Sequence, residues 1–176
     1  MLKYFVGVLV VLSLCEACEG QHVTIRAPDG SYACGFRTRA GLITVAHLEG
    51  IGGVWVNRKF DCRMIKNNSG QLHDVGEGVP HYFLCRRGRR HALTVVRTEE
   101  TQWVCSKEFF PGESGLPVFG SSGQVVGFVL GNYVGRPYKG RVSRLLKIPE
   151  FRRSQNLENK KAKKPEVVAG LDVIDE

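Results

Sequence analysis

Apolar residues between positions 22 and 148 occur in short runs that are rich in β-branched side chains. Sequences such as PDG, NNSG and SSG separate the runs, and Gly, Pro, Asn, Asp and Ser are the residues that turns favour. No window shows the sustained 3.6-residue apolar repeat of an amphipathic helix. The pattern therefore predicts eleven short strands and almost no helix: 22–26, 31–38, 42–46, 53–56, 60–65, 81–86, 92–97, 102–106, 116–119, 124–130 and 141–146.

The fold class follows from the number and spacing of these strands. Many short strands with turns between them are typical of an all-β fold, either an antiparallel sandwich or a pair of small barrels. The chain has 176 residues, enough for one domain or for two small subdomains that share a core.

The two ends of the chain differ in composition from the middle. Residues 1–20 carry one Lys and then an apolar run from Tyr4 to Cys15, which is too short to span a bilayer and fits a signal peptide or the remnant of a membrane segment. Residues 151–176 are polar and begin with a basic stretch, which predicts a linker or tail. Residues 151–165 carry six Lys or Arg against one Glu, a local net charge of +5, whereas the whole chain has a formal net charge of +8.

The six cysteines do not form a metal-binding pattern. Cys15 and Cys18 lie in the segment already set aside, with no second CxxC and no nearby pair of histidines. The other four stand singly in strand-like runs, as buried free thiols or as disulfides of an oxidising compartment: Cys34, Cys62, Cys85 and Cys105. We expect no metal and no small-molecule cofactor. The glycosylation sequon at 67–69 matters only if the domain faces a secretory lumen.

A serine between glycines is the first candidate for chemistry. Ser114 stands in Gly112-Glu113-Ser114-Gly115, directly after Pro111. A nucleophilic serine needs an exposed hydroxyl and backbone N–H groups that point into the same space, and glycines permit such a bend. We expect the oxyanion hole in the loop 112–114, with the N–H groups of Gly112 and Ser114 as donors and Glu113 between them. The motif alone also fits an ordinary turn.

A base and an acid complete a catalytic triad with this serine. Among five histidines, His47 ends the strand-like run GLITVA and would be held at the corner between strand and loop. Asp61 and Asp74 both follow it in the order His, Asp, Ser. Asp61 falls inside the predicted strand 60–65, whereas Asp74 falls in a loop that can return to the histidine. The sequence analysis therefore selects Asp74 as the third member.

The region 109–143 resembles the NS3 serine proteases of the Flaviviridae. Its stretch GESGLPVF is similar to the pestivirus G-x-S-G-L-P-I-F, and Gly131-Asn132 and Val142-Ser143 are similar to the segment that follows the serine in flavivirus proteases. The sequence TVAH, which ends at His47, is similar to the T-A-A-H of chymotrypsin-like proteases. Only 40 positions separate Asp74 from Ser114, fewer than such relatives usually have, and the hepacivirus zinc site has no counterpart here.

The resemblance implies a chymotrypsin-like fold of two six-stranded β-barrels with the active site between them. Residues 21–78 would form the N-terminal barrel with His47 and Asp74, and residues 79–150 the C-terminal barrel with Ser114. It also implies a viral endopeptidase that cuts a polyprotein in the host cytoplasm at the endoplasmic reticulum membrane. The implied partners are the polyprotein substrate, a membrane-bound viral cofactor protein and a downstream helicase domain.

The resemblance also suggests where the substrate binds. Glu108, six residues before Ser114, would lie at the base of the S1 pocket and favour Arg or Lys at P1, the residue before the scissile bond. Leu130, Gly131 and Asn132 are also expected to bind the substrate. Arg141 replaces a tyrosine of the flavivirus enzymes and, if it neutralised Glu108, would favour an apolar P1. Glu108 as a plain surface charge is the third alternative.

Two other functions remain open at this stage. The chain fits a catalytically inactive, protease-like binding module, although such a copy would be free to lose His47, Asp74 or Ser114. It also fits a secreted cellular protease, although no R-I-V-G-like activation junction is visible. The RRGRR run at 86–90 has no interleaved aromatic residues, so we expect a solvated hairpin and no nucleic-acid partner.

Overall fold

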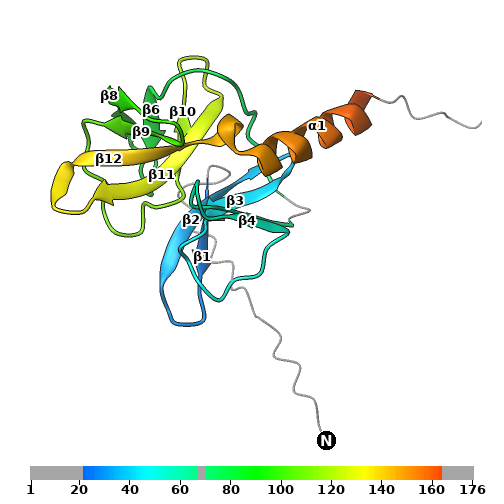
Figure 1. The fold of residues 1–176 in the computed structure, drawn as a ribbon, viewed down its shortest axis with the longest axis horizontal. Helices are drawn as coiled ribbons and strands as arrows, with labels where there is room; N and C mark the ends of the chain where they lie inside the picture. The colour runs from blue at the N-terminus through cyan, green and yellow to red at the C-terminus, as the bar shows by residue number, and fades with distance from the viewer. Residues whose placement is uncertain (1–21, 67–69, 164–176) are drawn as a thin grey trace, which may run out of the picture.

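The computed structural model describes residues 22–66 and 70–163, which form two antiparallel β-sheets and one C-terminal helix (Figure 1). The signal-like segment, Cys15, Cys18 and the sequon at 67–69 lie outside the described residues. No helix within the described ranges is long and apolar enough to cross a membrane.

The N-terminal sheet contains five strands in the order β1-β2-β3-β5-β4. Their bounds are Val23–Arg26 (β1), Tyr32–Thr38 (β2), Gly41–Val45 (β3), Trp55–Asn57 (β4) and Cys62–Ile65 (β5). The two central strands are apolar along most of their length, and every residue of β3 is buried. The strand β5 pairs directly with β3, in a register that places Val45 opposite Cys62.

The C-terminal sheet contains seven strands in the order β7-β6-β10-β11-β12-β9-β8. Their bounds are Tyr82–Leu84 (β6), Arg90–Ala92 (β7), Val95–Thr98 (β8), Gln102–Cys105 (β9), Pro117–Phe119 (β10), Val125–Tyr133 (β11) and Arg136–Arg144 (β12). The predicted strand 92–97 is in fact two strands, β7 and β8, which lie at opposite edges of this sheet. The sheets thus have five and seven described strands, where the resemblance implied six and six.

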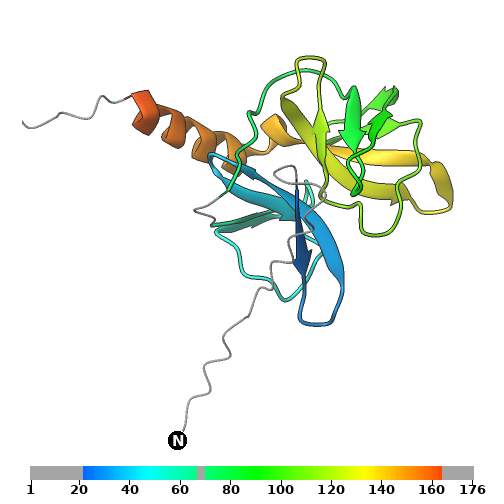
Figure 2. The same cartoon turned by 180° about the vertical axis from the view of Figure 1, so that it is seen from behind.

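One apolar core joins the two sheets. Side chains of the N-terminal sheet, such as Phe36 and Ile43, pack in the same cluster as Phe128 and Leu130 of β11. A second cluster lies inside the C-terminal sheet and is built around Trp103, Phe109 and other buried residues. This shared cluster holds the two sheets against each other, and it includes residues of both β2 and β11. Figure 2 shows the two sheets from behind.

The C-terminal segment differs from its prediction as a linker. A 3₁₀ turn, Leu145–Lys147 (η2), leads into the helix Pro149–Lys163 (α1). Ile148 and Phe151 are fully buried in the core cluster that the two sheets share, and the Asn57 amide donates a 2.9 Å hydrogen bond to Glu150. The sequence did not predict this helix because its composition is mostly polar. Two buried apolar residues, only three positions apart, are enough to hold it on the core.

Candidate active site

His47 follows β3 by two residues and is held there by Asp61. The His47 backbone N–H donates to Asp61 Oδ1 at 2.8 Å, and Nδ1 of the ring lies 2.5 Å from Asp61 Oδ2. A carboxylate can only accept, so this contact places the proton on Nδ1 and leaves Nε2 free to act as a base. The His47 side chain is 52% exposed and that of Asp61 25%, so a substrate can reach the ring.

The predicted partner Asp74 does not lie beside His47, and the assignment is corrected to Asp61. The reason is strand order: β5 is the neighbour of β3, so the register that pairs Val45 with Cys62 continues to Ala46 and Asp61. The Ala46 N–H accordingly donates to the Asp61 carbonyl at 3.1 Å. β4 and β5 form a hairpin in which β4 occupies the edge of the sheet and β5 lies next to β3. The chain therefore returns to His47 at Asp61, after only fourteen residues.

Asp74 lies at a different point between the sheets. Its side chain is exposed, and its carbonyl accepts a hydrogen bond from the Val125 N–H at the start of β11. Ser114 contacts the same strand at Leu130, five residues further on. At 3.3 Å per strand residue, this separation amounts to about 16 Å. With Asp61 as the acid, 53 positions separate acid and serine instead of 40, which removes the unusual shortness noted in the sequence.

Ser114 is fixed from both sheets. Its Oγ donates to the Leu130 carbonyl at 3.3 Å, and its own carbonyl accepts from the Cys34 N–H at 2.7 Å. Cys34 directly precedes Gly35 in β2, and Gly35 pairs with Thr44 of β3. The serine therefore packs against β2 beside the end of β3. β3 ends at Val45, two residues before His47. These hydrogen bonds bring the nucleophile and the base to the same end of the N-terminal sheet.

The loop before Ser114 has the bend that an oxyanion hole requires. Gly112 has a φ of +85°, and a Cβ there would lie 2.4 Å from the Tyr32 ring. Gly115 has a φ of +88°, and a Cβ there would lie 1.8 Å from the Cys34 carbonyl oxygen. Both positions thus require glycine for conformation and for space. This close packing sets the direction of the peptide groups around Ser114.

Glu113, the middle residue of the predicted oxyanion loop, has a structural part in it. Its backbone N–H donates to the Phe110 carbonyl at 3.0 Å, and its buried carboxylate accepts from the Phe110 N–H at 2.8 Å. Both groups are therefore engaged inside the loop. The N–H groups of Gly112 and Ser114 are the remaining candidates to bind an oxyanion.

Cys34 supports the same loop through its side chain. The Sγ atom donates to the Gly112 carbonyl at 3.2 Å, and burial raises the pKa of this thiol to about 12. The thiol is therefore neutral at physiological pH and packs as an uncharged group. Cys62, Cys85 and Cys105 are also free thiols, and burial raises the pKa of Cys105 to about 11.

Among the residues predicted to bind substrate, Leu130 and Gly131 lie next to Ser114. Leu130, Gly131 and Asn132 belong to the end of β11, where Leu130 touches the serine. The Asn132 carboxamide makes two hydrogen bonds to the backbone of Phe109, at 2.9 and 2.8 Å. Glu108 directly precedes Phe109 and is half-buried. The Asn132 amide thus ties the end of β11 to the segment that carries Glu108.

Arg141 does not make the ion pair with Glu108 that one of the sequence-based alternatives required. Its backbone pairs with Val104 and Gly131, and its guanidinium lies over the Tyr133 ring at 5.5 Å from the centroid. The ion pairs of the described residues do not include one between Arg141 and Glu108. The arrangement gives no support to a pocket that Arg141 neutralises.

The fold was compared with those of known proteins. No protein-family model and no curated protein sequence matches the chain. Solved structures do match: a human pathogenic astrovirus serine protease has a TM-score of 0.56 at 16% identity, over 74% of this chain and 91% of that one. The active form of the Rv3671c protease of M. tuberculosis has a TM-score of 0.54 at 15% identity, over 88% and 93%. A serine endoprotease of Yersinia pestis has a TM-score of 0.60 at 10% identity, over 80% of this chain and 65% of that one.

These similarities confirm the predicted fold class. The chain has the all-β fold of the chymotrypsin-like serine proteases, with two antiparallel sheets and the candidate site where they meet. The neighbours come from an animal virus and from two bacteria, so they do not single out the Flaviviridae. The resemblance to NS3 therefore stays a prediction of the sequence.

Proposed function

We propose that this protein is a serine endopeptidase in which Ser114 is the nucleophile, His47 the general base and Asp61 the residue that orients it. One observation carries the proposal: the Asp61 carboxylate binds both the backbone and the ring of His47, at the strand end that also holds Ser114. A surface histidine that merely ends a strand has no need to donate two hydrogen bonds to one carboxylate. A nucleophile, a base and an orienting acid are the parts that acyl transfer requires.

The proposed reaction proceeds by acyl transfer. His47 Nε2 takes the proton of Ser114 as Oγ attacks the scissile carbonyl carbon, and it returns that proton to the leaving amine when the peptide bond breaks. Asp61 stabilises the imidazolium that forms in between. The N–H groups of Gly112 and Ser114 bind the oxyanion of the tetrahedral intermediate, each worth about 3 kcal/mol in comparable sites. Water then hydrolyses the acyl-enzyme through the same base.

For the substrate, we propose a viral polyprotein. The support is the similarity of residues 109–143 to NS3 proteases, together with an astrovirus protease among the structural neighbours. A cytoplasmic location at the endoplasmic reticulum, a membrane-bound viral cofactor protein and a downstream helicase domain belong to the same proposal. An open reading frame that continues into helicase motifs would support it, whereas one that continues into a cellular secretory protein would contradict it.

A fluorophosphonate probe tests the catalytic part of the proposal. We expect the wild type to be labelled at Ser114, and the Ser114→Ala variant to lose both labelling and peptide cleavage while it keeps its circular dichroism spectrum and melting temperature. Ser122→Ala, an exposed serine in the turn after β10, is the matched control and should label as the wild type does. Cleavage by the Ser114→Ala variant at the wild-type rate would rule out the assignment, and a wild type that neither labels nor cleaves would favour the binding module.

A further inference from the structure

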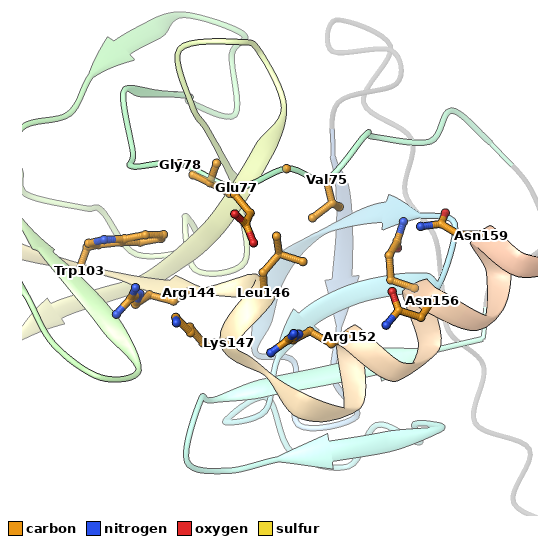
Figure 3. Close-up of a pocket in the computed structure, with 13 residues that line it drawn as sticks. Val75, Glu77, Gly78, Trp103, Arg144, Leu146, Lys147, Arg152, Asn156 and Asn159 are labelled. Atoms are coloured by element: carbon orange, nitrogen blue, oxygen red, sulfur yellow. The ribbon is translucent and has the colours of Figure 1, made fainter.

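A cavity of about 640 Å³ lies away from the proposed active site, between α1, the segment 75–78 that joins the two sheets, and the end of β12 (Figure 3). Val126 of β11 forms part of its wall. Leu130, which contacts Ser114, is four residues further along the same strand, or about 13 Å. The cavity is therefore a separate site, and its volume falls in the range of pockets that hold small ligands and cofactors.

The cavity wall is mainly cationic. Arg144, Lys147 and Arg152 line it, against the single carboxylate Glu77, which gives three positive charges and one negative charge, a net of +2. The three cations come from the continuous stretch 144–152 and the carboxylate from the segment that joins the sheets, and all four side chains line the same cavity (Figure 3). Such an arrangement attracts an anion, because the cations repel one another until a negative group lies between them.

Two buried polar atoms in this wall have no hydrogen-bond partner among the described residues: Arg144 Nε and Gln155 Oε1. The rest of the Arg144 guanidinium is already fixed, since one Nη donates to the Glu99 carbonyl at 2.9 Å and the group lies over the Trp103 ring. Native proteins rarely leave buried polar atoms unpaired. Both atoms have almost no accessible surface, so their side chains would have to shift before a ligand could bring an acceptor to Arg144 and a donor to Gln155.

The helix α1 presents amide side chains to the cavity along one face. Arg152, Gln155, Asn156 and Asn159 follow each other at intervals of three, one and three residues, the spacing of a single helix face. The buried Phe151 holds the helix in place. Carboxamides are the side chains that pair with the edges of nucleobases, and a carboxylate such as Glu77 can accept from ribose hydroxyl groups.

We propose that this cavity binds a nucleotide, either free or as a unit of a nucleic acid. The phosphate lies between Arg144, Lys147 and Arg152, the ribose faces Glu77, and the base edge meets the carboxamides of α1. An acidic peptide would satisfy the cations but would leave Glu77 facing a like charge. The sequence did not predict this site, because its residues come from four segments that are far apart in the chain.

Binding measurements on the full chain test the proposal. The probes are uridine and adenosine monophosphates, followed by calorimetry, and a fluorescein-labelled decauridylate, followed by anisotropy at several salt concentrations. We expect Lys147→Gln and Arg152→Gln to weaken binding about tenfold each, since each removes one charge-assisted contact. Arg153→Gln is the matched control: it is the next residue on α1, exposed, and does not line the cavity, so its affinity should stay within about twofold of wild type.

The outcomes separate the two sources of the ligand. Equal affinity for the mononucleotides and the decauridylate would assign a free nucleotide, and tighter binding of the decauridylate with a steep salt dependence would assign a nucleic acid. Absence of binding at millimolar concentration overturns the proposal. Equal weakening by Arg152→Gln and Arg153→Gln also overturns it, since that result indicates a general basic surface. A peptide of six glutamates serves as the acidic control, and binding it as tightly as the nucleotides would overturn the proposal as well. The Ser114→Ala variant should bind as the wild type does, which makes the result independent of the proposed protease activity.

Discussion

Asp61 binds His47 through both of its carboxylate oxygens, one on the backbone N–H and one on the ring. To do so, Asp61 adopts a φ of +49°, which makes it the one non-glycine residue of the described chain with a left-handed backbone. Asp and Asn are the residues that tolerate this conformation best. Backbone strain of this kind persists where the surrounding structure requires it, and it is frequent at active sites.

Replacing Asp61 by Asn should therefore abolish most of the activity. The amide can donate to Nδ1 and so favour the tautomer that carries its proton on Nε2, which cannot act as a base. We expect kcat on a cleavable peptide to fall about 10⁴-fold, with an unchanged circular dichroism spectrum. Asp74→Asn is the matched comparison, and its kcat should stay within a few-fold of the wild type. The reverse result, a large loss at Asp74 and a small one at Asp61, would restore the assignment made from the sequence.

The two assignments differ because local patterns do not determine strand order. The serine loop and the end of the strand before His47 could be predicted from glycines, turn residues and β-branched runs, all of which act within a few residues. The position of Asp61 depends on β5 pairing with β3 instead of remaining at an edge, and that choice depends on the whole core. One local signal was available: NRKFD, with an Asn and an Asp at its ends, is a turn sequence, and it places Asp61 before the strand.

The sequence analysis missed the helix α1 because most of its residues are polar, and the few buried apolar residues that hold it do not stand out from this composition. Phe151 is fully buried in the core cluster that the two sheets share. We expect Phe151→Ala to lower the free energy of unfolding by about 3–5 kcal/mol, measured by urea denaturation. Leu157→Ala is the control on the same helix, because Leu157 is 59% exposed and should change stability by less than about 0.5 kcal/mol. Equal effects of the two variants would mean that α1 does not pack as described.

The buried thiols predict a loss of stability at alkaline pH. Burial raises the pKa of Cys34 to about 12 from an ordinary value of 9.0, so the folded protein holds this proton more tightly than the unfolded chain does. The stabilisation is complete below about pH 9 and is lost as the pH rises from 9 toward 12. Three pH units correspond to about 4 kcal/mol for this thiol.

Urea denaturation at pH 7.5 and pH 10.5 measures this effect. We expect the wild type to lose more stability between the two pH values than Cys34→Ser does, because the serine hydroxyl does not titrate in this range. Serine can also donate to the Gly112 carbonyl, so the variant should retain the loop and part of the activity. An identical pH dependence in both proteins would show that the Cys34 thiol titrates normally.

The last prediction concerns the residue at P1. Ser114 touches Leu130, and the position of a Cβ on Gly131 would lie 3.8 Å from its Oγ, so a substrate that reaches the serine lies against the end of β11. We expect the side chain at P1 to point between β11 and the segment that carries Glu108, which the Asn132 amide holds together. Arg141 lies over Tyr133 and forms no ion pair with Glu108 within the described part of the chain. We therefore expect the Glu108 carboxylate to prefer a cationic partner in the substrate.

Profiling the purified protein on a peptide library should thus give Arg or Lys at P1. Glu108→Gln should reduce kcat/KM for a peptide with Arg at P1 by about tenfold or more, the effect of losing one charge-assisted contact, and should change labelling by a fluorophosphonate much less. Glu100→Gln, an exposed carboxylate paired with Lys59, is the control and should leave both values unchanged. A preference for Leu over Arg in the wild type would rule out the basic pocket. Ser114 would still be labelled in that case. The result would therefore contradict the predicted specificity but not the proposed catalytic mechanism.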